Sequence, residues 1–262
     1  MYNNLMTLQI LKLSTITPHA IVVSDSRQAL RRIETGEMKI EDNTKKVVPI
    51  GNRAIAFSHG GITNFLTGGA LIEGITHGFC TLGTSIRDMA FELNDFITQQ
   101  CRLTPVPQTN PATSLITLTG FSDGSNNPEV YELNPPYEPH CNTVSVGDTV
   151  NFYGSPWGQE VARALMCGGC PTSNELSYVT REARSSLRRK LELSSKASYP
   201  KTSKEWAERI SLVMQQVIEA LRWKVKEPTV PPDWFMPNEN QFSAIGGNPQ
   251  IAIIEPNRNR TF

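Results

Sequence analysis

The sequence predicts an α+β fold in which antiparallel sheets are covered by helices. Three observations support this prediction: paired strand signals open the chain, runs of strands then alternate with runs of helices, and no βαβ repeat is present. With 39% hydrophobic and 19% charged residues, the chain is too apolar to be disordered. Its 262 residues can bury a sizeable core, and we expect a single domain over residues 1–262.

Short apolar segments rich in β-branched residues predict the strands of the first half. These strands are residues 7–13, 20–24, 46–50 and 54–57. The first two read as a hairpin, and the last two flank Gly51, whose backbone freedom suits a tight turn. Between the two hairpins, residues 28–44 are polar and contain Gly36, so we expect a loop with at most a short strand.

Helical periodicity begins at residue 84, where apolar residues recur at spacings of three and four. The expected helices are residues 84–97, 159–166, 174–193 and 203–224. The last of these is introduced by Thr202 and Glu205, which form a capping-box pattern. The remaining expected strands are residues 114–121, 129–133, 149–153 and 250–254.

The charge balance and the apolar pattern exclude several classes of protein. The 25 basic residues are balanced by 25 acidic ones, so we expect neither a nucleic-acid partner nor a membrane-surface partner. No apolar run reaches about 18 residues, and the N-terminal stretch reads as a strand and not as a signal peptide. Five cysteines are an odd number for a disulfide scaffold, which makes the cytoplasm the default location.

Three segments, taken in order, resemble the proteasome subunit superfamily of N-terminal-nucleophile hydrolases. They are AIVVSDSR at residues 20–27, TKKVVPIGNRAIAFSHGG at 44–61 and SLITLTGFSDGSNNPEVYELN at 114–134. The likeness covers residues 7 to about 165, includes Gly154-Ser155 before a helix, and extends more weakly over 203–255. It implies a four-layer αββα sandwich, with two antiparallel sheets between helical layers. Residues 62–83 and 170–200 would then be insertions.

The family's chemistry assigns roles to four residues. Its nucleophile is a threonine exposed by removal of a leader, and the threonine's own α-amine acts as the base. By position this is Thr7, which makes residues 1–6 a short propeptide. Asp25 and Lys46 match the family's Asp and Lys, which set the local electrostatics, and the amide of Gly60 would stabilise the oxyanion. Arg27 is expected to be a structural partner of the neighbouring loop.

The resemblance implies a threonine-type peptidase or amidohydrolase, provided that the N-terminus is processed. It also implies a peptide or protein substrate, a homo-oligomer and no cofactor. Two alternatives stay open: a non-catalytic structural or assembly subunit, and a peptide ligase or transpeptidase that uses the same nucleophile. In the late motif of the family, this chain keeps Gly246 and Gly247 but lacks the Asp and the Ser.

Simpler interpretations stand beside these roles. Thr7 is also an ordinary strand former, and Asp25 with Lys46 could be an ordinary ion pair. Cys167 and Cys170 form a lone CxxC that follows a helix, so we expect a loop near the helix end and no metal site.

Overall fold

The computed structural model describes residues 2–5, 7–32, 38–58, 85–101, 116–154, 156–167, 189, 199–221, 235–236, 242–243 and 245–256. The chain divides into two compact units. Unit 1 comprises Met1–Ile10, Val23–Thr44 and Phe152–Gln250, and unit 2 comprises Leu11–Val22, Lys45–Asn151 and Ile251–Phe262.

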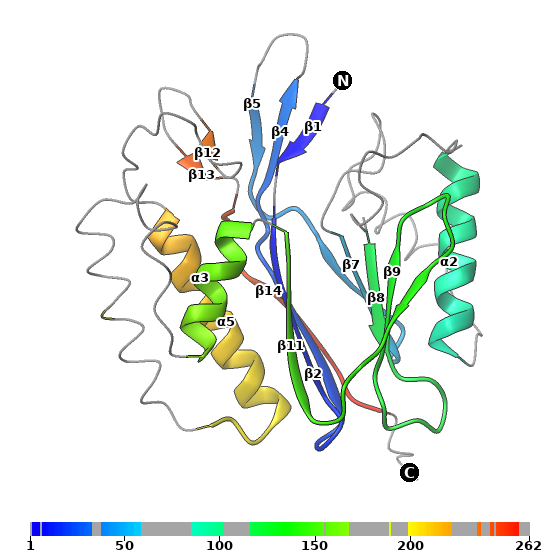
Figure 1. The fold of residues 1–262 in the computed structure, drawn as a ribbon. Coiled ribbons are helices and arrows are strands. Elements are labelled where there is room, and N and C mark those ends of the chain that lie inside the picture. The colour runs from blue at the N-terminus through cyan, green and yellow to red at the C-terminus, as the bar shows by residue number, and fades with distance from the viewer. Residues whose placement is uncertain are drawn as a thin grey trace. The chain divides into compact units, whose positions relative to one another are not determined.

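Unit 2 contains a five-stranded antiparallel sheet in the order β10-β9-β8-β7-β6. Its strands are β6 (Val47–Ile50), β7 (Ala54–Ser58), β8 (Ile116–Gly120), β9 (Glu129–Leu133) and β10 (His140–Asn142). Helix α2 (Ile86–Cys101) packs against β8 and β9 (Figure 1). The apolar face of α2, including Met89, Leu93 and Ile97, is buried in one cluster with Leu118 and Leu133. Burial of this face explains its helical periodicity.

In its described residues, unit 1 contains a three-stranded sheet in the order β1-β4-β5 and the helices α3 and α5. The strands are β1 (Tyr2–Leu5), β4 (Gln28–Arg32) and β5 (Met38–Glu41). Helices α3 (Pro156–Cys167) and α5 (Ser203–Leu221) lie side by side (Figure 1). Two short strands, β12 (Phe235–Met236) and β13 (Phe242–Ser243), pair with each other.

The sequence-based expectation of a loop over residues 28–44 is wrong, because this segment forms β4 and β5. Strand β4 pairs antiparallel with β1 on one side and with β5 on the other. The backbone ladders satisfy the N–H and C=O groups of β4, so the segment needs no alternating apolar pattern to be a strand.

A further sheet has the order β11-β2-β3-β14. Its strands are β2 (Leu8–Ser14), β3 (His19–Ser24), β11 (Asp148–Gly154) and β14 (Gln250–Ile254). Every residue of β2 and β3 is buried, as is typical of strands that are covered on both faces. The turn at residues 15–18 joins the two strands as a hairpin, as the sequence predicts.

The described elements confirm the α+β class with antiparallel sheets and are compatible with a proteasome-like sandwich. The single-domain assignment stays a prediction. The expected helix at 174–193 and the expected insertions at 62–83 and 170–200 lie almost entirely outside the described residues. Among the helices that are described, none has the length and apolar character needed to cross a membrane.

Candidate active site

The β2–β3 hairpin brings Thr7 and Asp25 together. Thr7 directly precedes β2, and Asp25 directly follows β3. The amide of Asp25 donates to the carbonyl of Leu8 at 3.1 Å, which sets the register at this end of the hairpin. Thr7 is 5% exposed and Asp25 is fully buried, so their contact is shielded from water.

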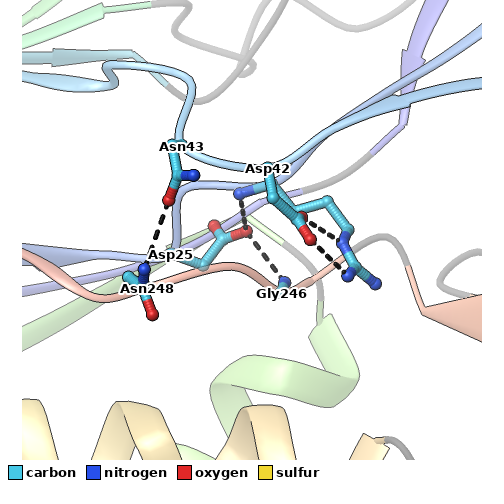
Figure 2. Close-up of polar contacts among 6 residues, drawn as sticks. Asp25, Asp42, Asn43, Gly246 and Asn248 are labelled. Atoms are coloured by element: carbon cyan, nitrogen blue, oxygen red, sulfur yellow. Dashed lines mark hydrogen bonds and ion pairs between the residues drawn. The ribbon is translucent and has the colours of Figure 1, made fainter.

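From the described residues, the Asp25 carboxylate accepts four hydrogen bonds. Oδ1 accepts from the hydroxyl of Thr7 and, at 2.9 Å, from the amide of Leu8. Oδ2 accepts from the amides of Arg27 and Gly246, both at 3.2 Å (Figure 2). The three backbone amides fix the orientation of the carboxylate, because each comes from a different part of the chain. Oδ1 is thereby held where it accepts the hydrogen bond from the Thr7 hydroxyl and orients it.

Gly246 supports this arrangement through both of its backbone polar groups. Its carbonyl accepts from the amides of Ser26 at 3.1 Å and Arg27 at 3.0 Å. A Cβ at this position would lie 2.5 Å from Nε and Cζ of the Arg27 side chain. A side chain at position 246 would therefore push the Arg27 guanidinium out of its present position.

The Arg27 guanidinium is held by a bidentate contact with Asp42. Nε and Nη2 donate to the two oxygens of the Asp42 carboxylate at 2.7 and 2.9 Å (Figure 2). These hydrogen bonds raise the pKa of Arg27 above its ordinary value, although burial acts in the opposite direction. The expectation that Arg27 is a structural partner of a neighbouring loop is confirmed.

Two further contacts join the same segments. The side-chain amide of Asn248 donates to Oδ1 of Asn43 at 3.3 Å, and that of Gln250 donates to the carbonyl of Thr44 at 2.7 Å (Figure 2 shows the first). The amide of Thr44 donates in turn to the carbonyl of Ser26 at 2.8 Å. Residues 25–27, 42–44 and 246–250 are thus cross-linked around the Asp25 carboxylate, and we call this set of segments the Asp25 clamp.

Gly154 fits closely against Thr7. The residue has a φ of +95°, and a Cβ there would collide with the Thr7 carbonyl. A side chain at position 154 would therefore displace Thr7. The sequence pattern includes Gly154 before a helix, but nothing local in the sequence indicates that its backbone abuts the candidate nucleophile.

The other two predicted site residues are Lys46 and Gly60. Lys46 is buried at 7% exposure directly before β6, and its carbonyl accepts from the amide of Ser58 at 3.1 Å in unit 2. Gly60 lies outside the described residues. The structure therefore brings Thr7 and Asp25 together, while the roles of Lys46 and Gly60 stay predictions.

Sequence reasoning did not identify the residues that hold Asp25. The amides of Leu8 and Gly246 and the carboxylate of Asp42 carry no motif of their own. The retained Gly246-Gly247 pair is a signal that could have indicated one of them. Within the described part of the chain, no cluster of three His, Cys, Asp or Glu residues could hold a metal ion.

Comparison with solved structures gives a likeness to this chain, whereas the sequence comparisons give none. No family model and no curated protein matches the sequence significantly. Among solved structures, the chain is similar to one described as Thiobacillus denitrificans BPH in complex with Epoxomicin. The TM-score is 0.44 and the sequence identity 10%, over 96% of this chain and 99% of that chain.

Proposed function

We propose that this chain is a peptide or amide hydrolase whose nucleophile is the hydroxyl of Thr7, made N-terminal by removal of residues 1–6. The observation that carries the proposal is the buried hydrogen bond from the Thr7 hydroxyl to Asp25. The ordered resemblance of three segments to N-terminal-nucleophile hydrolases supports the same residue. Both residues lie just outside the strands of the hairpin, Thr7 before β2 and Asp25 after β3.

In the proposed reaction, the Thr7 oxygen attacks the carbonyl carbon of the substrate amide. The α-amine of Thr7 takes the hydroxyl proton and delivers it to the leaving amine, and an ester to Thr7 forms. Water then attacks this ester and releases the acid, and the hydroxyl is restored. Asp25 orients the Thr7 hydroxyl, Lys46 contributes positive charge, and the Gly60 amide stabilises the oxyanion.

The first test asks whether a reactive amino-terminal threonine is produced. Intact-mass analysis of the purified protein should show a species that begins at Thr7. Periodate should convert it to an aldehyde that a hydrazide probe captures, because only an N-terminal Ser or Thr presents a 1,2-amino alcohol. We expect Thr7→Ser to keep the labelling and Thr7→Val to lose both the trimming and the labelling.

An untrimmed and unlabelled wild type would contradict the proposal that Thr7 is a catalytic nucleophile. If the wild type retains residues 1–6 under all conditions and is not labelled, no free amine exists at Thr7 and the proposed base is missing. Trimming that proceeds equally in Thr7→Val would show that another protease removes residues 1–6; the enzyme is then contradicted if the trimmed wild type hydrolyses peptide amides no faster than trimmed Thr7→Val.

A second candidate function is a non-catalytic structural subunit of the same fold. The observation that favours it is β1, which pairs antiparallel with β4 from Tyr2↔Arg32 to Leu5↔Ala29. The segment before Thr7 therefore has a place in a sheet, and the nitrogen of Thr7 is then a peptide nitrogen. This candidate predicts an untrimmed chain that forms a homo-oligomer in light scattering, and a strict monomer would contradict it.

The ligase alternative uses the same nucleophile and differs only in the acceptor. An amine in place of water would attack the ester at Thr7 and form a new amide. Adding a small primary amine to a working assay would then yield an amide product in competition with the free acid.

A further inference from the structure

The side chain of Lys12, on β2 in unit 2, is completely buried. Its Nζ lies 2.8 Å from a carboxylate oxygen of Asp148, the first residue of β11, and donates to the carbonyl of Leu13 at 3.0 Å. Asp148 is 24% exposed. A buried ammonium group is rare. Removing its charge from water costs several kcal/mol, and the ion pair and hydrogen bond that it forms inside the protein gain about as much. The proposed reaction makes no use of this group.

A histidine follows on the next strand. His19, the first residue of β3, is 1% exposed, and its Nε2 has no hydrogen-bond partner within the described structure. Strand β3 lies between β2 and β14 in the sheet. Glu255, which is exposed, directly follows β14. In the strand order β11-β2-β3-β14, the corresponding groups are Asp148, Lys12, His19 and Glu255, of which Glu255 lies one residue beyond its strand; we call these four groups the row.

The same end of the hairpin is tied to the loop before β11. The amide of Thr15 donates to the carbonyl of Gly147 at 3.1 Å, and the amide of Gly147 donates to the Thr15 hydroxyl at 2.7 Å. The Lys12–Asp148 ion pair and these bonds together close β2 onto β11. If His19 takes up a proton, its positive charge is therefore buried next to this closed end of the hairpin, away from water.

We infer that the row Asp148, Lys12, His19 and Glu255 is a pH-sensitive latch of unit 2, in which protonation of His19 loosens the closed end of the β2–β3 hairpin. A protonated His19 would be a second buried cation beside Lys12. Opening of the hairpin lets water reach both groups and relieves that cost. The inference concerns unit 2 alone and does not depend on the proposed function.

The electrostatic surroundings of His19 agree with this direction. Burial lowers the pKa of His19 below its ordinary value, and the charge of Lys12 lowers it further. A hydrogen bond with the Thr17 backbone and the charges of Asp148 and Glu255 oppose the change without reversing it. The open hairpin therefore takes up a proton more readily than the closed one. Closure weakens as the pH falls below about 6.5, the value for an exposed histidine.

Hydrogen exchange of the full-length protein tests the latch, with rates corrected for the intrinsic effect of pH. We expect residues 11–22 to lose protection between about pH 7.5 and about pH 5, while the β8–β9 hairpin of the same unit keeps it. The expected loss is about tenfold for each unit by which closure lowers the pKa of His19. His19→Gln should remove the loss, whereas His140→Gln, at an exposed position, should leave it unchanged.

Two results would overturn the inference. One is an undiminished loss of protection at low pH in His19→Gln. The other comes from the wild type itself, by NMR: an imidazole of His19 that titrates at or above about 6.5 would mean that closure does not disfavour its protonation. The NMR titration needs no variant, so the test stands even if His19→Gln fails to fold.

Discussion

Asp25 is held firmly because the four donors that reach it in the described part of the chain are themselves fixed by the fold. Three of the four donors are backbone amides, and the fourth is the hydroxyl of Thr7. An ionised carboxylate only accepts hydrogen bonds, so it suits a site in which these four neighbouring groups all donate. Asparagine has a side chain of the same shape, but its NH₂ group is a donor. In place of one carboxylate oxygen, it would face hydrogen-bond donors that it cannot accept from.

Asp25→Asn should therefore destabilise the protein and slow the formation of the Thr7 N-terminus. We expect a loss of about 2–3 kcal/mol, since two buried donors lose their acceptor. Urea unfolding measures the stability and intact mass the trimming. Asp123→Asn is the matched control: it weakens the half-exposed contact with Arg53 in unit 2 and should cost less than about 1 kcal/mol. Equal losses in the two variants would contradict the argument.

A substitution at Gly154 tests how closely the backbone of Thr7 packs against this position. Gly154→Ala adds both a left-handed alanine and a collision with the Thr7 carbonyl, a backbone atom that cannot rotate away. We expect a loss of about 2–4 kcal/mol in urea unfolding. Gly124→Ala is the control, since Gly124 also has a positive φ, +73°, but open space around its Cβ position. It should cost only about 1 kcal/mol, and similar losses at both positions would mean that Thr7 is loosely seated.

Helix α5 begins with the contacts that its sequence predicts. The amide of Glu205 donates to the Thr202 hydroxyl at 3.2 Å, and the Glu205 carboxylate accepts from the amide of Thr202 at 3.4 Å. The ring of Tyr199 packs edge-on against Trp206, with centroids 5.1 Å apart. The helix therefore starts from a reciprocal cap and an aromatic contact.

Thr202→Ala should cost about 1 kcal/mol of unfolding free energy, because the amide of Glu205 loses its acceptor at the helix start. Lys204→Ala, an exposed change in the same turn between two good helix formers, is the control and should change the stability by less than about 0.5 kcal/mol. Denaturant unfolding followed by circular dichroism compares the two. A cost at Thr202 no larger than at Lys204 would show that the cap does not contribute.

Elements with a strong local pattern could be predicted from the sequence. Strands β9 and β14 have the bounds expected from their apolar pattern, and helix α2 follows the spacing of its apolar face. Strands β4 and β10 could not be predicted in this way. Strand β4 is defined by its partners on both sides, and β10 has only the three residues that pair with β9. In both cases the pairing, and not the pattern of side chains, makes the strand.

The residues of the candidate site also fall into those that the sequence indicates and those that only the fold brings together. The order of motifs pointed to Thr7 and Asp25, which are 18 positions apart and meet through one hairpin. The bond from Gly246 to Asp25 spans 221 positions, and no local pattern encodes a contact of that length. The Asp25 clamp, including Asp42 and Asn248, therefore became visible only with the fold.

Across the whole molecule, positive and negative charges are balanced, yet the side chain of Lys12 is completely buried. Burial lowers the pKa of Lys12, and its hydrogen bond and attraction to Asp148 only partly offset this. The unfolded chain therefore holds the Lys12 proton up to a higher pH than the folded protein does. Stability gained from this group is absent at neutral pH and appears as the pH rises through the folded pKa toward about 10.5.

Lys12→Met isolates that contribution, because the variant shares every other titrating group with the wild type. The wild type should gain stability relative to Lys12→Met between about pH 7.5 and about pH 9.5, by up to about 1.4 kcal/mol for each unit of pKa displacement. Asp148 is partly exposed and stays hydrated when its partner is removed, so the variant should still fold. Urea unfolding at several pH values measures the difference. A difference that stays constant, or that moves in favour of the variant as the pH rises, would mean that the buried ammonium is as well stabilised in the folded protein as it is in water.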